Sequence, residues 1–318
     1  MIDTLPLSWL KCGIAYPTFK SVRLPLSGLT WIHSAEIPFE LSFEEIYAEL
    51  VERFGEGILI RGCRSEIARF LTGRGFAALR TGAEALIDLR SDTRAHSLVK
   101  GLSRRGKRWG RVEEVPFTEA CAERFFRLRS ASAHGGKPQL RYLYRSVPDP
   151  LTRCFVYRTP GDRWLGAVTI SASSELGAHT EMILRDRDAP PGVMETLFLE
   201  IMDTFKEEGF KEFSLGEVPF VSHRFHADAA PPYGRYIKER LLFGTGYLLK
   251  YAYNFENLFR FKNKFRPEWE PVYICAPKIS WTALADMFVE TGFYALSRSA
   301  LVSTMRTAAP RYKGSSTT

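Results

Sequence analysis

The chain has 318 residues, 45 % of them hydrophobic, and a formal net charge of +8. The length suits about two domains of ~150 residues, and the charge favours RNA or an anionic membrane surface as a partner. No stretch reaches ~18 uninterrupted apolar residues, and the N-terminus lacks a signal-peptide pattern. We therefore expect a cytoplasmic protein without a transmembrane helix, with peripheral contact to the inner membrane face left open.

The cysteines are odd in number, scattered, and form no C-x-x-C pair. This spacing argues against a zinc site and against a disulfide framework. We expect reduced thiols and no bound metal. The five residues are Cys12, Cys63, Cys121, Cys154 and Cys275.

Helical and strand-like patterns alternate in the first quarter of the chain. Apolar residues at helical spacing predict helices over 44–54 and 65–73. The run 57–61 predicts a short buried strand, and 75–89 predicts two strand-like pieces separated at Thr81-Gly82. This alternation favours an α/β or α+β layered fold.

The segment 94–111 carries seven Lys or Arg and no Asp or Glu. Surface helices usually mix both signs of charge, so a run of one sign favours phosphate contact over a merely solvated helix face. Arg104 and Arg105, adjacent in this run, are therefore predicted to bind the substrate.

Residues 119–132 predict another amphipathic helix, with Phe125, Phe126 and Leu128 in the core. The overlapping segment 130–150 is rich in Gly, Pro and Ser, which is typical of a domain junction. We expect two domains and a disordered tail. Their ranges are 1–145, 146–306 and 307–318.

Strand patterns follow the junction. Runs at 153–158, 164–172 and 178–185 are separated by turn residues, which predicts an antiparallel meander. Residues 193–209 carry a single apolar stripe and predict a long helix. Near the C-terminal end, a helix over 281–305 is apolar on one face, which suits packing on the domain better than resting on a membrane.

Alternation in the run 178–185 divides its side chains between two faces. One face suits a core, and the other carries an acid and a cation about 13 Å apart along the strand, which suits a cleft. The expected core face has Ala178, Thr180, Met182 and Leu184, and the other has His179, Glu181, Ile183 and Arg185.

The strand, loop and helix at 178–209 resemble the acyl-CoA-binding part of GNAT acetyltransferases. In those enzymes a Gly-rich loop offers N–H groups to a pyrophosphate at the helix N-terminus. Here the loop reads RDRDAPPGVME, in which Pro190 and Pro191 have no N–H and only Gly192 is available. The sequence therefore predicts a GNAT-like skeleton with an acyl donor other than CoA.

Two longer segments carry a more specific resemblance. APPGVMETLFLEIMDTFKEEGFKEFSLGEVPF (189–220) and YNFENLFRFKNKFRPEWEPVYI (253–274) resemble the C-terminal catalytic domain of phosphatidylglycerol lysyltransferases and alanyltransferases. The resemblance implies two tandem GNAT-like domains with mixed, largely antiparallel sheets flanked by helices. It also implies transfer of an aminoacyl group from aminoacyl-tRNA to a hydroxyl of a membrane phospholipid such as phosphatidylglycerol at the bilayer surface.

Full-length members of that family carry an N-terminal multi-helix membrane flippase. This sequence begins at Met1 without such a segment. We therefore expect a standalone synthase rather than a piece of a longer protein.

The implied chemistry exchanges one ester for another, so it needs no ATP, metal or other cofactor. It needs a base, donors for the oxyanion and a carboxylate for the ammonium of the amino acid. We assign Glu181 to the base or ammonium contact and Arg185 to a phosphate, with Glu217 as a second acid. Lys262 and Lys264, which match the family's F-K-x-K-F motif, would support the oxyanion or the tRNA terminus.

The family usually has D-x-x-R on the strand before the loop. Here Glu181 takes the place of Asp, and one more residue precedes Arg185. This departure leaves the amino acid that is transferred undefined.

Aromatic and basic residues alternate in the last motif. Tyr253 and Phe259 would contact and stack on the terminal adenine of the tRNA, and Arg266 would add countercharge. Trp269 and Pro271 are expected to anchor the following strand in the core.

Three other functions compete with this one. An aminoacyl-tRNA-dependent transferase acting on a peptide or peptidoglycan amine would share the tandem architecture. An acyl-CoA N-acyltransferase is opposed by the proline-filled loop. A non-catalytic RNA- or membrane-binding module would bind without product chemistry.

Overall fold

The computed structural model of the protein describes residues 2–91, 97–221 and 236–308. Its strands are β1 (Leu10–Cys12), β2 (Thr18–Arg23), β3 (Thr30–Pro38), β4 (Ile58–Cys63), β5 (Ala77–Asp88), β6 (Arg111–Val115), β7 (Arg153–Arg158), β8 (Trp164–Ser174), β9 (Gly177–Arg185), β10 (Glu212–Pro219) and β11 (Glu268–Ala276). Its α-helices are α1 (Phe43–Phe54), α2 (Ser65–Thr72), α3 (Ser97–Gly106), α4 (Glu119–Ala131), α5 (Val193–Glu207), α6 (Tyr236–Leu248), α7 (Phe255–Asn263), α8 (Trp281–Glu290) and α9 (Phe293–Ala308).

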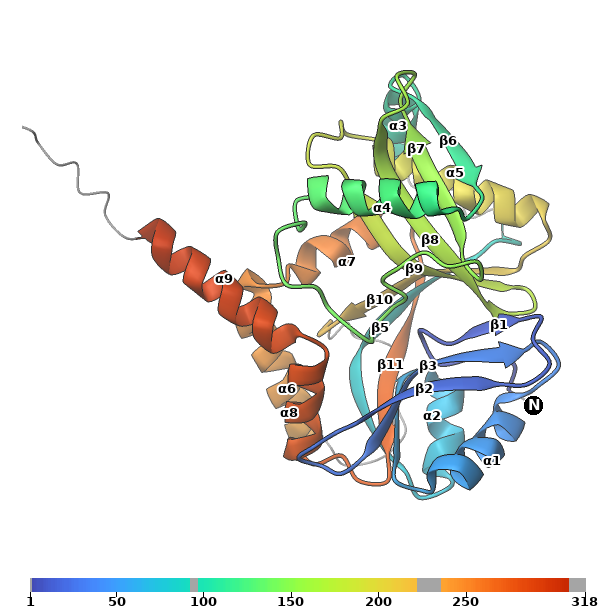
Figure 1. The fold of residues 1–318 in the computed structure, drawn as a ribbon, viewed down its shortest axis with the longest axis vertical. Helices are drawn as coiled ribbons and strands as arrows, with labels where there is room; N and C mark the ends of the chain where they lie inside the picture. Colours follow the sequence, from blue (N-terminus) through green and yellow to red (C-terminus); the bar gives the residue numbers. More distant parts are fainter. Residues whose placement is uncertain (1, 92–96, 222–235, 309–318) are drawn as a thin grey trace, which may run out of the picture.

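These strands form one 11-stranded mixed sheet with helices against it (Figure 1). The strand order is β1-β3-β4-β11-β5-β10-β9-β8-β7-β6, with β2 paired to β3. The predicted α/β class is confirmed, and so is the antiparallel meander, which β7, β8 and β9 form.

Strand β11 comes from the last part of the chain but lies among the strands of the first part. It pairs antiparallel with both β4 and β5. The sheet is therefore continuous from the first half of the chain into the second. The domain ranges 1–145 and 146–306 remain a prediction.

Helices cover both faces of the sheet. Successive residues of β7 show the two faces, because Phe155 packs in the core beneath α5 and Val156 packs in the core beneath α4. In β4, Ile60 packs with α1 and α2, whereas Leu59 packs with Met287 of α8. Both faces are therefore covered along the middle of the sheet.

The predicted break at Thr81-Gly82 is wrong, because β5 runs without interruption through both residues. Gly82 pairs with Pro219 of β10 and with Val272 of β11. A Cβ at Gly82 would lie 2.4 Å from the carbonyl oxygen of Val218. The glycine therefore marks a close approach of two strands rather than a turn.

The predicted helix over 281–305 is two helices, α8 and α9. Gly292 separates them with φ +82°, a conformation that favours glycine. The prediction for α4 is partly wrong, because Phe125 and Leu128 are buried but Phe126 is 43 % exposed. The predicted tail starts at residue 307, whereas α9 continues to Ala308; the rest of that tail lies outside the described residues.

Candidate active site

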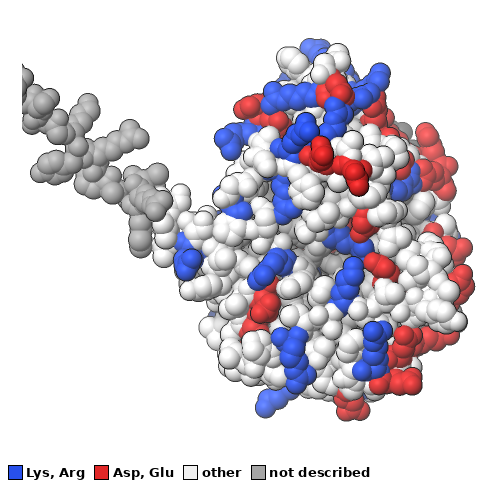
Figure 2. Space-filling view, viewed as in Figure 1, with Lys and Arg blue, Asp and Glu red and all other residues white. Residues whose placement is uncertain are grey.

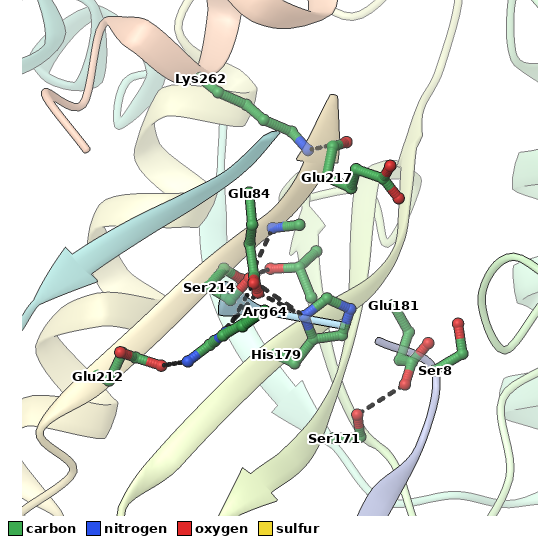
Figure 3. Close-up of polar contacts among 12 residues, drawn as sticks. Ser8, Arg64, Glu84, Ser171, His179, Glu181, Glu212, Ser214, Glu217 and Lys262 are labelled. Carbon is green, nitrogen blue, oxygen red and sulfur yellow. Dashed lines mark hydrogen bonds and ion pairs between the residues drawn. The ribbon is translucent and has the colours of Figure 1, made fainter. Parts of the chain in front are cut away.

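The site lies where two neighbouring parallel strands part. β9 and β10 are paired only up to His179 and Ser214. Beyond that pair, β9 continues against β8, and β10 continues against β5. Side chains at this point of divergence come from both strands and from α7 (Figure 3).

Each of the two strands carries an irregularity at the divergence. In β9, Thr180 pairs with Ile170 and Met182 pairs with Thr169, so Glu181 is the extra residue of a bulge. The bulge shifts the alternation of side chains. The predicted single core face is therefore wrong: Ala178 packs in the core beneath α5, whereas Met182 and Leu184 pack in the core beneath α4.

Lys262 projects from α7 into the divergence (Figure 3). It is 3 % exposed, and its Nζ donates a 3.0 Å hydrogen bond to the backbone carbonyl oxygen of Glu217. Burial disfavours the ammonium form and lowers the pKa of Lys262 to about 7, although Glu217 and Glu84 oppose the shift. This amine can therefore both accept and donate a proton near neutral pH.

Gly216 makes room for that amine. Its φ is +84°, and a Cβ there would lie 3.3 Å from the Nζ of Lys262 and 3.4 Å from the carbonyl oxygen of Thr180. Any side chain at position 216 would therefore crowd the lysine as well as strain the backbone.

The carboxylate of Glu217 does not contact Lys262. It forms an ion pair with Arg61 of β4 and accepts a 3.2 Å hydrogen bond from Thr81 of β5. Glu217, predicted as a second acid, thus contacts Lys262 through its backbone carbonyl. Its side chain links β10 to β4 and β5.

A buried polar network, which the sequence analysis missed, lies beneath the divergence (Figure 3). Glu84 of β5 is fully buried, pairs with Arg64 at 2.7 Å and accepts a hydrogen bond from Ser214. His179 Nδ1 is 3.1 Å from the same Ser214 hydroxyl. Burial alone would raise the pKa of Glu84, but the Arg64 guanidinium holds it well below its usual range. The signal for this network was an acid inside the apolar run of β5.

Glu181 lies two residues after His179 on β9 and makes polar contacts of its own. It is buried, and its carboxylate accepts hydrogen bonds from the Ser171 hydroxyl at 2.7 Å and from the backbone N–H of Arg145 at 2.9 Å. Arg145 lies in the segment that was predicted as a domain junction. The structure thus places Glu181 on the strand that borders the divergence, with its carboxylate held in place.

Arg185 and Lys264 each bind a residue at or just before the N-terminus of α5. Arg185, at the end of β9, donates a hydrogen bond to the carbonyl oxygen of Ala189 in the loop before α5. Lys264 forms a 2.9 Å ion pair with Glu195 in the first turn of α5. The two lysines of the F-K-x-K-F motif therefore have different surroundings, and only Lys262 reaches β10. The predicted roles of Arg185 and Lys264 remain predictions.

The predicted aromatic contacts lie mostly within the protein. Phe259 stacks on Trp269 with ring centroids 4.8 Å apart, and Tyr253 packs edge-on against Phe293 at 5.8 Å. Arg266 is exposed, just after α7. Contact of these three predicted residues with an adenine remains a prediction.

Helix α3, which carries the exposed Arg104 and Arg105, covers the N-terminus of α5. Thr196 of α5 donates a 3.1 Å hydrogen bond to the carbonyl oxygen of Ser103, and a Cβ at Gly192 would lie 2.1 Å from the carbonyl oxygen of Leu102. A diphosphate therefore has no room at this helix end. Pro190 and Pro191, just before it, also have no N–H group to offer.

Within the described residues, His, Cys, Asp and Glu side chains form no group of three or more that could hold a metal ion. Among the helices in this part of the chain, none combines the length and apolar character needed to cross a membrane.

A parallel strand pair that parts beside a helix, in a mixed sheet covered by helices, defines an α/β protein with a GNAT-like fold. The chain belongs to the family described as "Phosphatidylglycerol lysyltransferase, C-terminal", whose sequence profile matches residues 41–276.

Curated relatives agree with this membership. A phosphatidylglycerol lysyltransferase of Bacillus subtilis (strain 168) is 24 % identical over 249 residues, covering 76 % of this chain and 28 % of the relative. A lysylphosphatidylglycerol biosynthesis bifunctional protein, LysX, of Gordonia bronchialis is 22 % identical over 281 residues, covering 79 % of this chain and 23 % of the relative. The chain thus spans about a quarter of the length of these relatives.

Solved structures show the same fold. The structure of L-PGS from Bacillus licheniformis has a TM-score of 0.65 at 18 % identity, and covers 86 % of this chain and 85 % of that chain. A C-terminal domain from Agrobacterium fabrum, described as that of a lysylphosphatidylglycerol synthetase, has a TM-score of 0.64 at 21 % identity, with coverage of 86 % and 84 %.

Proposed function

We propose that the chain is an aminoacyltransferase that moves an aminoacyl group from aminoacyl-tRNA to a hydroxyl of a phospholipid such as phosphatidylglycerol. The observation that carries the proposal is the buried Lys262, with its pKa near 7, at the divergence of β9 and β10. The relatives named as phosphatidylglycerol lysyltransferases supply the lipid class and the reaction.

The reaction forms a bond from the acceptor oxygen to the carbonyl carbon and breaks the bond from that carbon to the ribose oxygen. Neutral Lys262 would take the proton of the attacking hydroxyl, and the resulting ammonium would give it to the leaving ribose oxygen. Between the two steps, the same ammonium would lie beside the tetrahedral oxyanion. One amine with a pKa near neutrality suits both proton transfers.

Glu181 would contact the α-ammonium of the transferred amino acid. Its carboxylate already accepts two hydrogen bonds, from Ser171 and from the Arg145 backbone, which fix its position. A fixed, buried carboxylate attracts an ammonium group strongly, because the surroundings screen the charges less than water does. This choice leaves Lys262 as the proposed base.

The crowded N-terminus of α5 supports a donor other than acyl-CoA. The basic helix α3 supports tRNA, because Arg104 and Arg105 are exposed on the helix that covers the N-terminus of α5 and are not in the buried network. Figure 2 shows basic side chains spread over the middle of one face, while acidic side chains gather towards one edge. Such a face suits a polyanion.

The test combines the purified chain with aminoacyl-tRNA charged with a radiolabelled amino acid and with phosphatidylglycerol vesicles. Label in the lipid extract, with the mass of an aminoacyl ester, is the expected result, and ribonuclease treatment of the tRNA should remove it. Lys262→Met should abolish the product, whereas Lys206→Met, at an exposed position on α5, should not. Label found only on an added peptide amine would overturn the lipid acceptor.

A further inference from the structure

Helices α8 and α9 lie outside the residues that match the family, 41–276. Figure 1 shows α9 projecting away from the body of the molecule. The segment just before α8 is joined to α6, because Lys238 of α6 donates a hydrogen bond of 2.6 Å to the carbonyl oxygen of Ile279. The three helices therefore form one side of the molecule.

Each of these helices exposes large apolar side chains at helical spacing, so that each helix has an apolar face turned to solvent. The members are between 46 % and 75 % exposed. They are Ile237 and Leu241 on α6, Trp281 and Val289 on α8, and Tyr294 and Leu301 on α9. We call this set the apolar stripe surface.

Basic side chains border the apolar stripe surface. The Nζ of Lys238 is 5.7 Å from the ring centroid of Trp281, and Lys278 and Arg298 are exposed. Of the three acidic residues of α6 and α8, Glu239 pairs with Arg80 and Asp286 is buried against the backbone N–H groups of Leu26 and Ser27. The third, Glu290, is half-buried at the C-terminal end of α8. In Figure 2 the surface at the base of the projecting helix is mostly uncharged, with isolated basic side chains.

The same helices are packed against the segment that carries the site. Phe293, at the start of α9, contacts the ring of Tyr253, which lies just before α7. Phe255 of α7 packs with Val218 of β10, next to Glu217. A molecule held on the apolar stripe surface would thus be close to the elements that position Lys262.

We propose that the apolar stripe surface rests on an anionic lipid bilayer, with its apolar side chains at the level of the headgroups and its Lys and Arg side chains on lipid phosphates. Large exposed apolar side chains bordered by more cations than exposed acids are the composition of an interfacial helix surface. Bound in this way, the surface would also bring a lipid acceptor to Lys262, and this second step rests on the proposed function.

The test measures partition of the full chain onto vesicles of pure phosphatidylcholine and of phosphatidylcholine mixed with phosphatidylglycerol. We expect binding to the mixed vesicles that falls with added salt. The double variant Trp281→Ser/Tyr294→Ser should lower the partition coefficient by about tenfold or more, and tenfold corresponds to about 1.4 kcal/mol. Its thermal unfolding should not change, because both side chains are exposed.

Tyr16→Ser is the matched control. Tyr16 is 81 % exposed and lies between β1 and β2, outside α6, α8 and α9. This control should bind vesicles like the wild type. Trp109→Ser, which removes an exposed ring next to α3, tests the rival surface.

Three results would overturn the inference. They are equal binding of the wild type and the double variant, loss of binding in Trp109→Ser alone, and a wild-type dimer in solution that the double variant dissociates. The double variant should also still aminoacylate phosphatidylglycerol dispersed in detergent. If the wild type makes no aminoacyl lipid at all, the proposed function fails while the vesicle measurement still decides this inference.

Discussion

The side-chain amine of Lys262 donates to the backbone carbonyl of Glu217 and not to its carboxylate, which Arg61 holds. Burial removes the water that would solvate an ammonium, and one hydrogen bond to a neutral carbonyl does not replace that solvation. The lysine is therefore buried without a directly paired counter-charge, which is the physical origin of its low pKa.

The first prediction concerns the pH dependence of the reaction. If neutral Lys262 is the base, kcat/KM should rise with pH and level off above a midpoint near 7. The measurement is initial rates between about pH 6 and 8, where the lysine changes its charge state. A profile that is flat across this range, or that falls with pH, would remove Lys262 as the base.

The second prediction concerns stability. The folded pKa of Lys262 lies below its ordinary value of 10.5, so the unfolded chain binds one more proton between pH 7 and 10.5, and wild-type stability rises across that window. Lys262→Met should therefore raise the free energy of unfolding by a few kcal/mol at pH 7 and below, and the gain should shrink towards pH 10. Urea unfolding at several pH values measures it. A less stable Lys262→Met at pH 7 would contradict it.

The third prediction compares two glycines. Gly216→Ala and Gly209→Ala place a side chain at similar φ values, +84° and +89°, but only position 216 has Lys262 within 4 Å. Both should lose about 1–2 kcal/mol of stability from backbone strain. Only Gly216→Ala should also lose most of its activity, because the lysine is displaced. Equal activity of the two variants would show that the position of Lys262 does not matter.

The fourth prediction concerns the buried pair of Arg64 and Glu84. Glu84→Gln should destabilise the protein by about 3–5 kcal/mol at pH 7, because it leaves a buried guanidinium with less countercharge. Folding lowers the pKa of Glu84 below its ordinary value of 4.5. The ionised Glu84 therefore stabilises the folded protein above pH 4.5, and this stabilisation is lost as the pH falls below that value. Glu123→Gln, in an exposed pair with Arg127, should cost below about 0.5 kcal/mol. Chemical unfolding checks both variants.

The fifth prediction concerns α3. Arg104→Glu/Arg105→Glu should weaken tRNA binding by tenfold or more at low salt, and should reduce the slope of log affinity against log salt. Lys206→Glu/Lys211→Glu reverses two exposed charges at the far end of α5 and should have a smaller effect. Filter binding over a salt series measures both, and equal effects would indicate attraction by net charge alone.

The local patterns predicted the elements of the second half well. The meander of β7 to β9 and the long helix α5 depend on turns and on apolar spacing, which are visible over a few residues. Lys262 was found through its motif. Its burial was not predicted, because the surroundings of a side chain depend on which distant strands lie beside it.

Other features could not be read from local patterns. The bulge at Glu181 adds one residue to β9. Every later side chain of β9 therefore points to the opposite face of the sheet from the one that simple alternation predicts, and the residue types of the strand give no sign of it. Glu84 and Arg64 are twenty positions apart, and their pairing needs the folded sheet. Gly82 has the appearance of a turn residue because glycine serves both turns and close strand approach.

The insertion of β11 between β4 and β5 has a consequence for synthesis on the ribosome. While the nascent chain is shorter than about 276 residues, β4 and β5 have no partner strand between them, and each would present an open edge. The early half cannot close its core until the late half has emerged, so chaperone protection during translation should matter more for this protein than for one whose domains fold in order.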